Sequence, residues 1–181
     1  DEVNATNSNM TSVLLQNLDG SFAVNGGTLS TVASGSSFNS FNVIQNDAGA
    51  TRALSLAVDN LTITHDASGA TVTPSEHGIV VTTSGDDSAV VSISNSTFQA
   101  EDSGVRLIGN NGLVTVTNFA DNTLLGSATA FDPNLFGNGV NFQGVTFDSD
   151  LSTAGLQAVN GGTFTAGAPG LAVNHGIFFD S

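Results

Sequence analysis

The chain of 181 residues contains no cysteine, no lysine, no tryptophan and no tyrosine. Without cysteine, neither a disulfide framework nor a thiolate metal site can form. Arg52 and Arg106 are the only permanently basic side chains against 16 acidic residues, so the formal net charge is -14. Because phosphate binding needs clustered Lys and Arg, we expect no nucleic-acid partner and no docking on anionic lipid.

Long hydrophobic runs are also missing. Apolar residues make up 39% of the chain, but they stand singly or in short groups among Ser, Thr, Asn and Gly. No stretch approaches the roughly 20 apolar residues of a membrane span, so we expect no membrane insertion. No stretch of about twelve residues carries the apolar period of a helix either.

The first residues, DEVNATNSNM, lack an initiator methionine. This is expected of a mature product whose export signal has been removed. Together with the absence of lysine and the abundance of Asn, Thr, Ser and Gly, it favours a secreted protein, either extracellular or at the cell surface.

Short β-like runs dominate the chain, and Gly, Asn and Asp separate them. Examples are FNVI (41–44), ALSLAV (53–58), GIVVTT (78–83) and AVVSIS (89–94). The length suits one domain with its own core. We therefore predict an all-β fold, with residues 1–15 as an N-terminal arm or cap and residues 16–181 as a single domain.

Five similar units each begin with a glycine, continue with a short strand and a turn, and end with a second strand closed by phenylalanine. The glycines are Gly78, Gly104, Gly139, Gly155 and Gly170. The turn varies in length from unit to unit while the apolar pattern persists. This behaviour is typical of solenoid coils, whose inward side chains stack while their corners protrude into solvent.

Phenylalanine supplies all the aromatic content, with 12 residues. Phe rings stack inside a narrow β core without the hydrogen-bond partner that a buried Tyr or Trp requires. We predict that the five that close the units form one ladder; ordinary core aromatics of a β-sandwich are the alternative. They are Phe98, Phe119, Phe147, Phe164 and Phe179.

The openings GIVV (78–81) and GVRL (104–107), with the endings VSISNSTF (91–98) and VTVTNF (114–119), carry a family resemblance. They resemble the right-handed parallel β-helix superfamily, the pectin-lyase-like solenoids that include polysaccharide lyases, phage tailspikes, autotransporter passengers and bacterial surface adhesins. The resemblance covers about residues 50 to 181 and implies roughly seven or eight short coils. It concerns the fold and does not transfer a function. A β-sandwich is the alternative fold.

The resemblance implies, for lyases, a basic proton abstractor and in many cases Asp-bound calcium. Alternation places Arg106 on the opposite strand face from Val105 and Leu107, where we expect it to be solvated, so no catalytic residue and no enzyme is predicted. His65, His77 and His175 show no close metal-ligand spacing and are expected at the surface. The candidate calcium ligands, with solvated corners as the alternative, are Asp86, Asp87, Asp148 and Asp150. No other cofactor is expected.

Threonines occur in TxT patterns at 62–64, 71–73 and 115–117. A flat array of outward threonines on a β-solenoid binds ice only if it recurs at one position of successive coils, and these three do not clearly align. Sequons for N-glycosylation begin at Asn4, Asn9, Asn60 and Asn95, and several are expected by chance in such a composition.

The words AVNGGT occur twice, at 23–28 and at 158–163. Duplication explains this, but a solenoid also exposes unpaired backbone and core at each end unless a cap covers it. Near the C-terminus the chain reads NHGIFFDS, with no evident cap. The residues predicted to form an assembly interface are Val13, Leu14, Leu15, Phe22, Val24, Leu171, Val173, Ile177, Phe178 and Phe179.

These features predict a secreted, non-enzymatic structural protein, a subunit of an extracellular filament or surface assembly. Its partner is a further copy of itself, stacked head to tail, with N-terminal strand exchange as an added contact. An adhesin or passenger module that binds a surface glycan or host surface is the alternative. A polysaccharide-active enzyme of the same fold is the third reading.

Overall fold

The computed structural model describes residues 1–8, 10–32, 39–66, 77–100, 103–125, 140–147, 163–165 and 177–180. These residues form β-strands, turns and bends, and no helix occurs among them. The expectation of an all-β fold is thereby confirmed. The short apolar runs, separated by Gly, Asn and Asp, form strands because β-branched residues suit a pleated, half-buried surface.

One sheet contains six strands, and their order across the sheet is their order along the chain. They are β2 (Val13–Gln16), β4 (Phe41–Gln45), β6 (Ile79–Ser84), β9 (Val105–Asn110), β12 (Val140–Gln143) and β15 (Ile177–Asp180). Each neighbouring pair is parallel.

The second sheet contains nine strands, again paired in parallel. They are β1 (Val3–Ser8), β3 (Gly20–Val32), β5 (Ala53–Asp66), β7 (Ser88–Ser94), β8 (Thr97–Gln99), β10 (Leu113–Ala120), β11 (Thr123–Leu125), β13 (Val145–Phe147) and β14 (Thr163–Thr165). The strands β3 and β5 are long and extend through both halves of this sheet, which separate shorter strands form in the later layers. Strand β5 pairs with β7 along its first half and with β8 along its second half.

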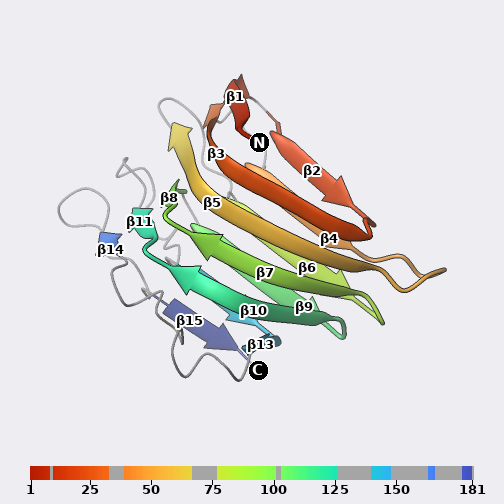
Figure 1. Ribbon diagram of the computed structural model, residues 1–181. Helices are drawn as coiled ribbons and strands as arrows, with labels where there is room; N and C mark the ends of the chain where they lie inside the picture. The colour runs from red at the N-terminus through yellow and green to blue at the C-terminus, as the bar shows by residue number, and fades with distance from the viewer. Residues whose placement is uncertain are drawn as a thin grey trace.

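The chain alternates between the two sheets and so builds layers (Figure 1). Each layer is one strand of the six-stranded sheet followed by its strand or strands in the nine-stranded sheet. Layers one to four comprise residues 13–32, 41–66, 79–99 and 105–125. Because parallel neighbours belong to successive layers, no helical crossover is needed between them. The N- and C-terminal residues lie at opposite ends of the stack (Figure 1).

A residue with positive φ bends each layer between the two halves of the nine-stranded sheet, and in layer one the next residue, Gly27 (φ 125°), has positive φ as well. The bend residues are Gly26 (φ 103°), Asn60 (φ 55°), Asn95 (φ 50°) and Asp121 (φ 56°). They occupy one register position, because the residues on either side of them pair across the strands. Gly, Asn and Asp enter this left-handed region at the least cost, which explains why these residue types punctuate the apolar runs.

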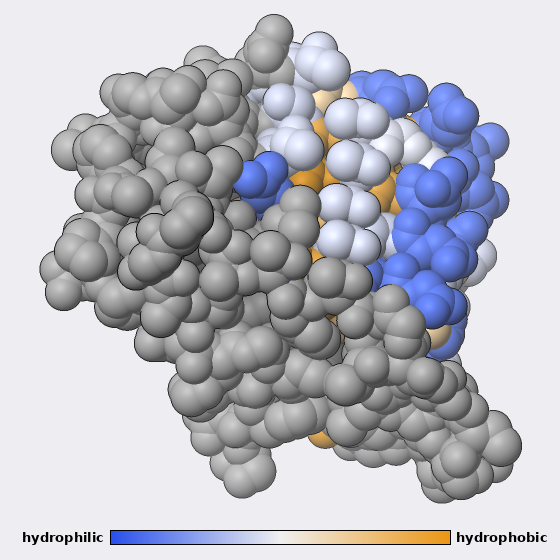
Figure 2. All heavy atoms as spheres, turned by 90° about the vertical axis from the view of Figure 1, so that its left-hand side faces the viewer, coloured by the Kyte–Doolittle hydropathy of each residue, from blue (hydrophilic) through white to orange (hydrophobic). Residues whose placement is uncertain are grey.

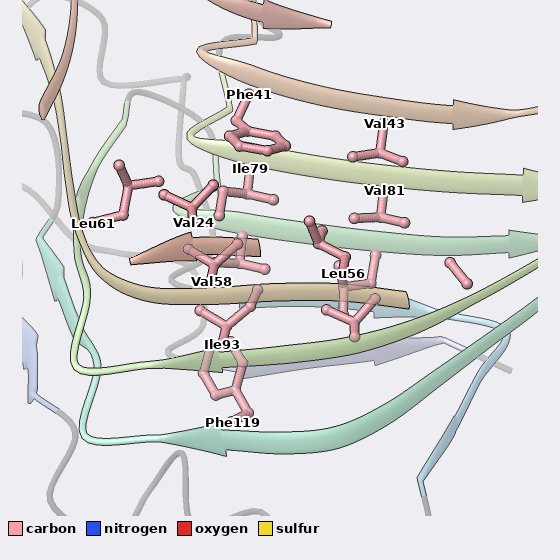
Figure 3. Close-up of a cluster of buried hydrophobic side chains, with 14 of the residues drawn as sticks. Val24, Phe41, Val43, Leu56, Val58, Leu61, Ile79, Val81, Ile93 and Phe119 are labelled. Atoms are coloured by element: carbon pink, nitrogen blue, oxygen red, sulfur yellow. The ribbon is translucent and has the colours of Figure 1, made fainter. Parts of the chain in front are cut away.

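The core lies between the sheets, where side chains from alternate strand positions meet. Figure 3 shows Phe41 and Ile79 of the six-stranded sheet on one side and Val58 and Ile93 of the nine-stranded sheet on the other. All four are at most 1% exposed. Burial of such side chains stabilises the fold by about 1.5–3 kcal/mol each.

Two of the glycine-led units align as predicted. The Gly78 N–H donates to the Ser103 carbonyl (3.0 Å), and the Ile79 N–H donates to the Gly104 carbonyl (2.9 Å). A Cβ on Gly78 would lie 2.4 Å from the Gly104 oxygen, so the close approach of these layers requires glycine here. The glycines that begin the other three units lie outside the described residues, but the strand that follows residue 139, β12, pairs in register with β9.

The prediction of one phenylalanine ladder is wrong. Phe98 and Phe164 share a column through β11. Phe119, Phe147 and Phe179 pair at three other register positions, on β10, β13 and β15. The reason is that every inward column is filled by whichever large apolar residue fits its volume, so Leu, Ile, Val and Phe alternate along one column.

Candidate assembly interface

The first layer leaves part of the core uncovered. Val13 and Phe22 pair in register with Phe41 and Leu56 of layer two. Phe41 and Leu56 are at most 1% exposed, whereas Val13 and Phe22 are only partly buried although they pack against the same core. Phe22 meets Phe41 edge to face, with ring centroids 6.3 Å apart. The difference between equivalent positions in adjacent layers marks an open end of the core.

The other residues predicted at this end occupy different surroundings. Leu14 is 55% exposed, while Leu15 and Val24 are 9% and 0% exposed. Leu14 therefore lies on the outer face of β2, and the chain itself already covers Leu15 and Val24. Only Val13 and Phe22 of the N-terminal set combine an inward position with partial exposure.

The strand β1 covers the second half of β3. Val3 pairs with Gly27 and Ala5 pairs with Leu29, which is fully buried. A Cβ on Gly27 would lie 2.0 Å from the Val3 oxygen, so the close approach of β1 depends on this glycine. Residues 3–8 thus cap half of the first layer within the same chain. The first half of β3 and the edge of β2 carry no further strand among the residues described.

At the other end, β15 is the last strand of the six-stranded sheet and pairs with β12. Through β12, Ile177 and Phe179 share register positions with Val105 and Leu107, which are both 0% exposed. Phe178 shares the register position of Arg106. The other two predicted interface residues, Leu171 and Val173, lie outside the described residues.

The adjacent aspartates 86 and 87 differ in environment. Asp86 is exposed in a turn, whereas Asp87 is 1% exposed. The Asp87 carboxylate accepts the backbone N–H of Asp47 (2.8 Å) and that of Arg52 (2.7 Å). Both of its oxygens thereby hold the loop that precedes β5. Within the described ranges no three acidic or His side chains gather as they would around a metal ion; residues 148 and 150 lie outside those ranges.

Arg52 ties the corners of the first two layers together. Its Nη1 lies 2.8 Å from Asp19 Oδ2, and its Nη2 lies 2.8 Å from Asp47 Oδ2. The backbone N–H of Ala53 and then the guanidinium lower the pKa of Asp19. The backbone N–H of Gly49 and then the guanidinium lower the pKa of Asp47. The hydrogen bonds to both carboxylates raise the pKa of Arg52.

The second arginine also has a partner, which corrects the expectation of a solvated side chain. Arg106 Nη1 lies 3.0 Å from His77 Nε2, and His77 Nδ1 accepts the backbone N–H of Ser103 (3.2 Å). His77 is 4% exposed, so the expectation of a surface histidine is wrong for this residue. Val80 pairs with Arg106, which brings the arginine beside the segment that enters β6. The side chains of residues 65 and 175 lie outside the description.

The sequence reasoning missed a column of threonines at one register position. The column runs through Thr28, Thr62, Thr97, Thr123 and Thr163. The first four follow a bend position by two residues, in NGGT, DNLT, SNST and ADNT, and the sequence before Thr163 is again NGGT. That spacing is the signal that would have found the column. It also shows that the repeated AVNGGT places its threonine at the same position of the first and last strands in this column.

No helix long and apolar enough to cross a membrane occurs in the part of the chain that the structure describes. Compared with protein families, curated proteins and solved structures, the chain matches none of them. The resemblance to the parallel β-helix superfamily therefore stays a prediction.

Proposed function

We propose that the chain is a right-handed parallel β-helix and the secreted, non-enzymatic subunit of an extracellular filament or surface assembly. The fold proposal is supported by parallel pairing throughout both sheets and by the agreement between strand order and chain order in the six-stranded sheet. It is also supported by the recurrent bend residue, which divides the nine-stranded sheet into two halves that lie at an angle to each other. Right-handed crossovers predominate where parallel strands are connected.

The observation that carries the assembly proposal is the open core at layer one. Val13 and Phe22 are partly exposed, whereas the residues that pair with them in layer two are buried. Full burial of these two side chains would contribute about 1 kcal/mol each beyond their present burial. Among the residues described, β2 also has no strand on its outer edge, and such an edge is a template for another strand.

A further copy of the chain fits this end because the two edge strands of the six-stranded sheet run in the same direction. Strand β15 of one copy continues the parallel sheet when it lies beside β2 of the next. Such a contact joins two different surfaces and does not close on itself, so it produces a filament. The strand β1 pairs with β3 of its own chain. In a strand exchange it would make the same contacts with β3 of a second copy.

The net charge of -14 opposes this association. Repulsion between exposed charges is screened over about 10 Å at roughly 0.1 M salt and over shorter distances at higher salt. We therefore expect assembly to strengthen with ionic strength. An association driven by opposite charges would weaken instead.

The test is particle size, measured by light scattering and negative-stain microscopy over a series of salt concentrations. The wild-type chain should form fibres at raised salt. Val13→Asp should prevent them, because it places a charge in the open core. Leu14→Asp is the matched control, since Leu14 lies on the outer face of the same strand and is 55% exposed.

Circular dichroism should show that both variants keep the β-sheet fold. Wild-type particles of 18.2 kDa under every condition would overturn the filament proposal and fit an adhesin module. Equal assembly of the two variants would show that the open core of layer one is not the interface.

A further inference from the structure

The threonine column is a continuous ladder of five parallel rungs, one on each of β3, β5, β8, β11 and β14. Among the residues that the structure describes, no other outward position of the nine-stranded sheet repeats one residue type on five strands. The bend position, two residues before the threonine, carries Gly, Asn, Asn and Asp in the four layers. The outward position of Ser21 carries Ser55, Val90 and Thr115 on the next three strands. The repetition is thus specific to one line of the surface.

The threonines on β3, β5, β8 and β11 point away from the core. On β5, Leu61 and Ile63 flank Thr62 and are both 0% exposed, and on β8 the neighbour Phe98 is also 0% exposed. Because side chains alternate along a strand, the threonines between them face outward. Figure 2 views this side of the molecule and shows a column of residues of near-zero hydropathy, bordered on one side by strongly hydrophilic residues.

Four hydroxyl groups of this column have no partner inside the described part of the protein. Thr28, Thr62, Thr97 and Thr123 make no side-chain hydrogen bond there. Thr117, at the irregular register of β10, differs from them, since its Oγ1 donates to the Val91 carbonyl (3.3 Å). The ladder therefore offers a row of free hydroxyls, each beside a methyl group, on a rigid and fully packed base.

The spacing of this row is set by the sheet. Parallel strands lie about 4.8 Å apart, so the hydroxyls recur at about that distance along the stack. Ser30 and Thr64 pair in register two residues further on, about 6.6 Å from the first row, but Gln99 and Leu125 hold this position on β8 and β11. The result is one regular row of hydroxyl and methyl groups, with a second pair of hydroxyls beside it on β3 and β5 only.

We infer that this threonine face binds the surface of ice. The spacing along the column is close to a repeat of oxygen atoms on a prism face of ice. A single hydroxyl gains little by exchanging one water for another. A row of evenly spaced groups held by one sheet makes its contacts with a matching lattice together, which is how weak contacts add up to stable binding.

The test measures thermal hysteresis and ice shaping by the intact chain at low salt, where fibres are not expected. The wild-type chain should lower the freezing point below the melting point and facet ice crystals. The variant Thr62→Tyr, combined with Thr97→Tyr, should lose both effects, because two bulky rings lift the face off the lattice. Tyr is a good strand former, so both chains should fold.

The matched control is Thr115→Tyr, an outward threonine on the other half of the same sheet, which should keep the wild-type activity. Circular dichroism melting of each variant separates loss of binding from loss of fold. Absence of thermal hysteresis in the folded wild-type chain would overturn the inference, as would equal losses in the control and the double variant. If the chain is retained on crystalline cellulose or chitin and has no effect on ice, the inference is also overturned, and the threonine column is a surface for a crystalline glycan. Neither result bears on head-to-tail assembly, which particle size alone decides.

Discussion

Replacement of Asp87 by alanine tests whether this buried carboxylate is a structural clamp. Its side chain is 1% exposed and accepts two backbone N–H groups, those of Asp47 and Arg52, at 2.8 and 2.7 Å. The Asp87 carbonyl in turn accepts the N–H of Leu113 in layer four. Asp87 thus links the loop before β5 to the start of β10 in layer four.

The expected cost follows from these two hydrogen bonds. Each backbone N–H that loses its charged acceptor costs about 1–3 kcal/mol. Residues 46, 48 and 49 of the loop are exposed, so water can reach the freed groups and hold the sum near the lower end. We expect Asp87→Ala to lower the free energy of unfolding by about 2–4 kcal/mol, which corresponds to a melting temperature lower by roughly 8 °C.

Thermal and urea unfolding measure this effect, with Asp86→Ala as the control. Asp86 is exposed in the preceding turn, so its loss should change stability by no more than about 0.5 kcal/mol. The measurements are repeated with excess calcium and with a chelator. A chelator-resistant difference between the two variants is expected from the hydrogen bonds. Equal stabilities, or a difference that disappears with the chelator, would refute the clamp.

Three further predictions concern other parts of the fold. Asp19 and Asp47, which pair with Arg52, have pKa values below the ordinary 3.8. Their ionised forms therefore stabilise the folded state fully above about pH 3.8, and this stabilisation is lost as the pH falls through the lowered pKa values. The urea midpoint of Arg52→Met should therefore fall less between about pH 5 and about pH 2 than that of the wild type; an equal fall would contradict this. Gly27→Ala should detach β1 and expose its amides to hydrogen exchange, whereas Gly20→Ala, also at positive φ but with open space around it, should not. Phe98→Ala should cost about 3–5 kcal/mol in urea unfolding, since Phe98 is 0% exposed; a cost below about 1 kcal/mol would place this ring outside the core.

Local patterns were enough to predict the strands. The runs 41–44, 53–58 and 89–94 each lie within a strand, and the units that begin at Gly78 and Gly104 stack in register. The reason is that alternation and glycine punctuation act within a few residues. The identity of each inward column was not predictable in the same way, because any large apolar residue fills it.

Contacts between layers required the register itself. The links between layers differ in length, from residues 67–78 after layer two to residues 100–104 after layer three. Fixed-period alignment therefore hides the threonine column, and it hides the contact between His77 and Arg106, which are 29 residues apart. The partial exposure of Val13 and Phe22 is likewise a property of the missing neighbour and leaves no trace in the residues themselves.

The bend residues have a consequence for how such a chain changes over time. In each of the first four layers a Gly, Asn or Asp with positive φ stands two residues before the threonine. This bend fixes which of the following side chains point inward and which point outward, independently of the layer before. An insertion in one link is therefore absorbed before the next strand face begins and does not propagate to later layers. A layer added or deleted as a whole would lengthen or shorten the threonine column by one rung and leave the spacing of the others unchanged.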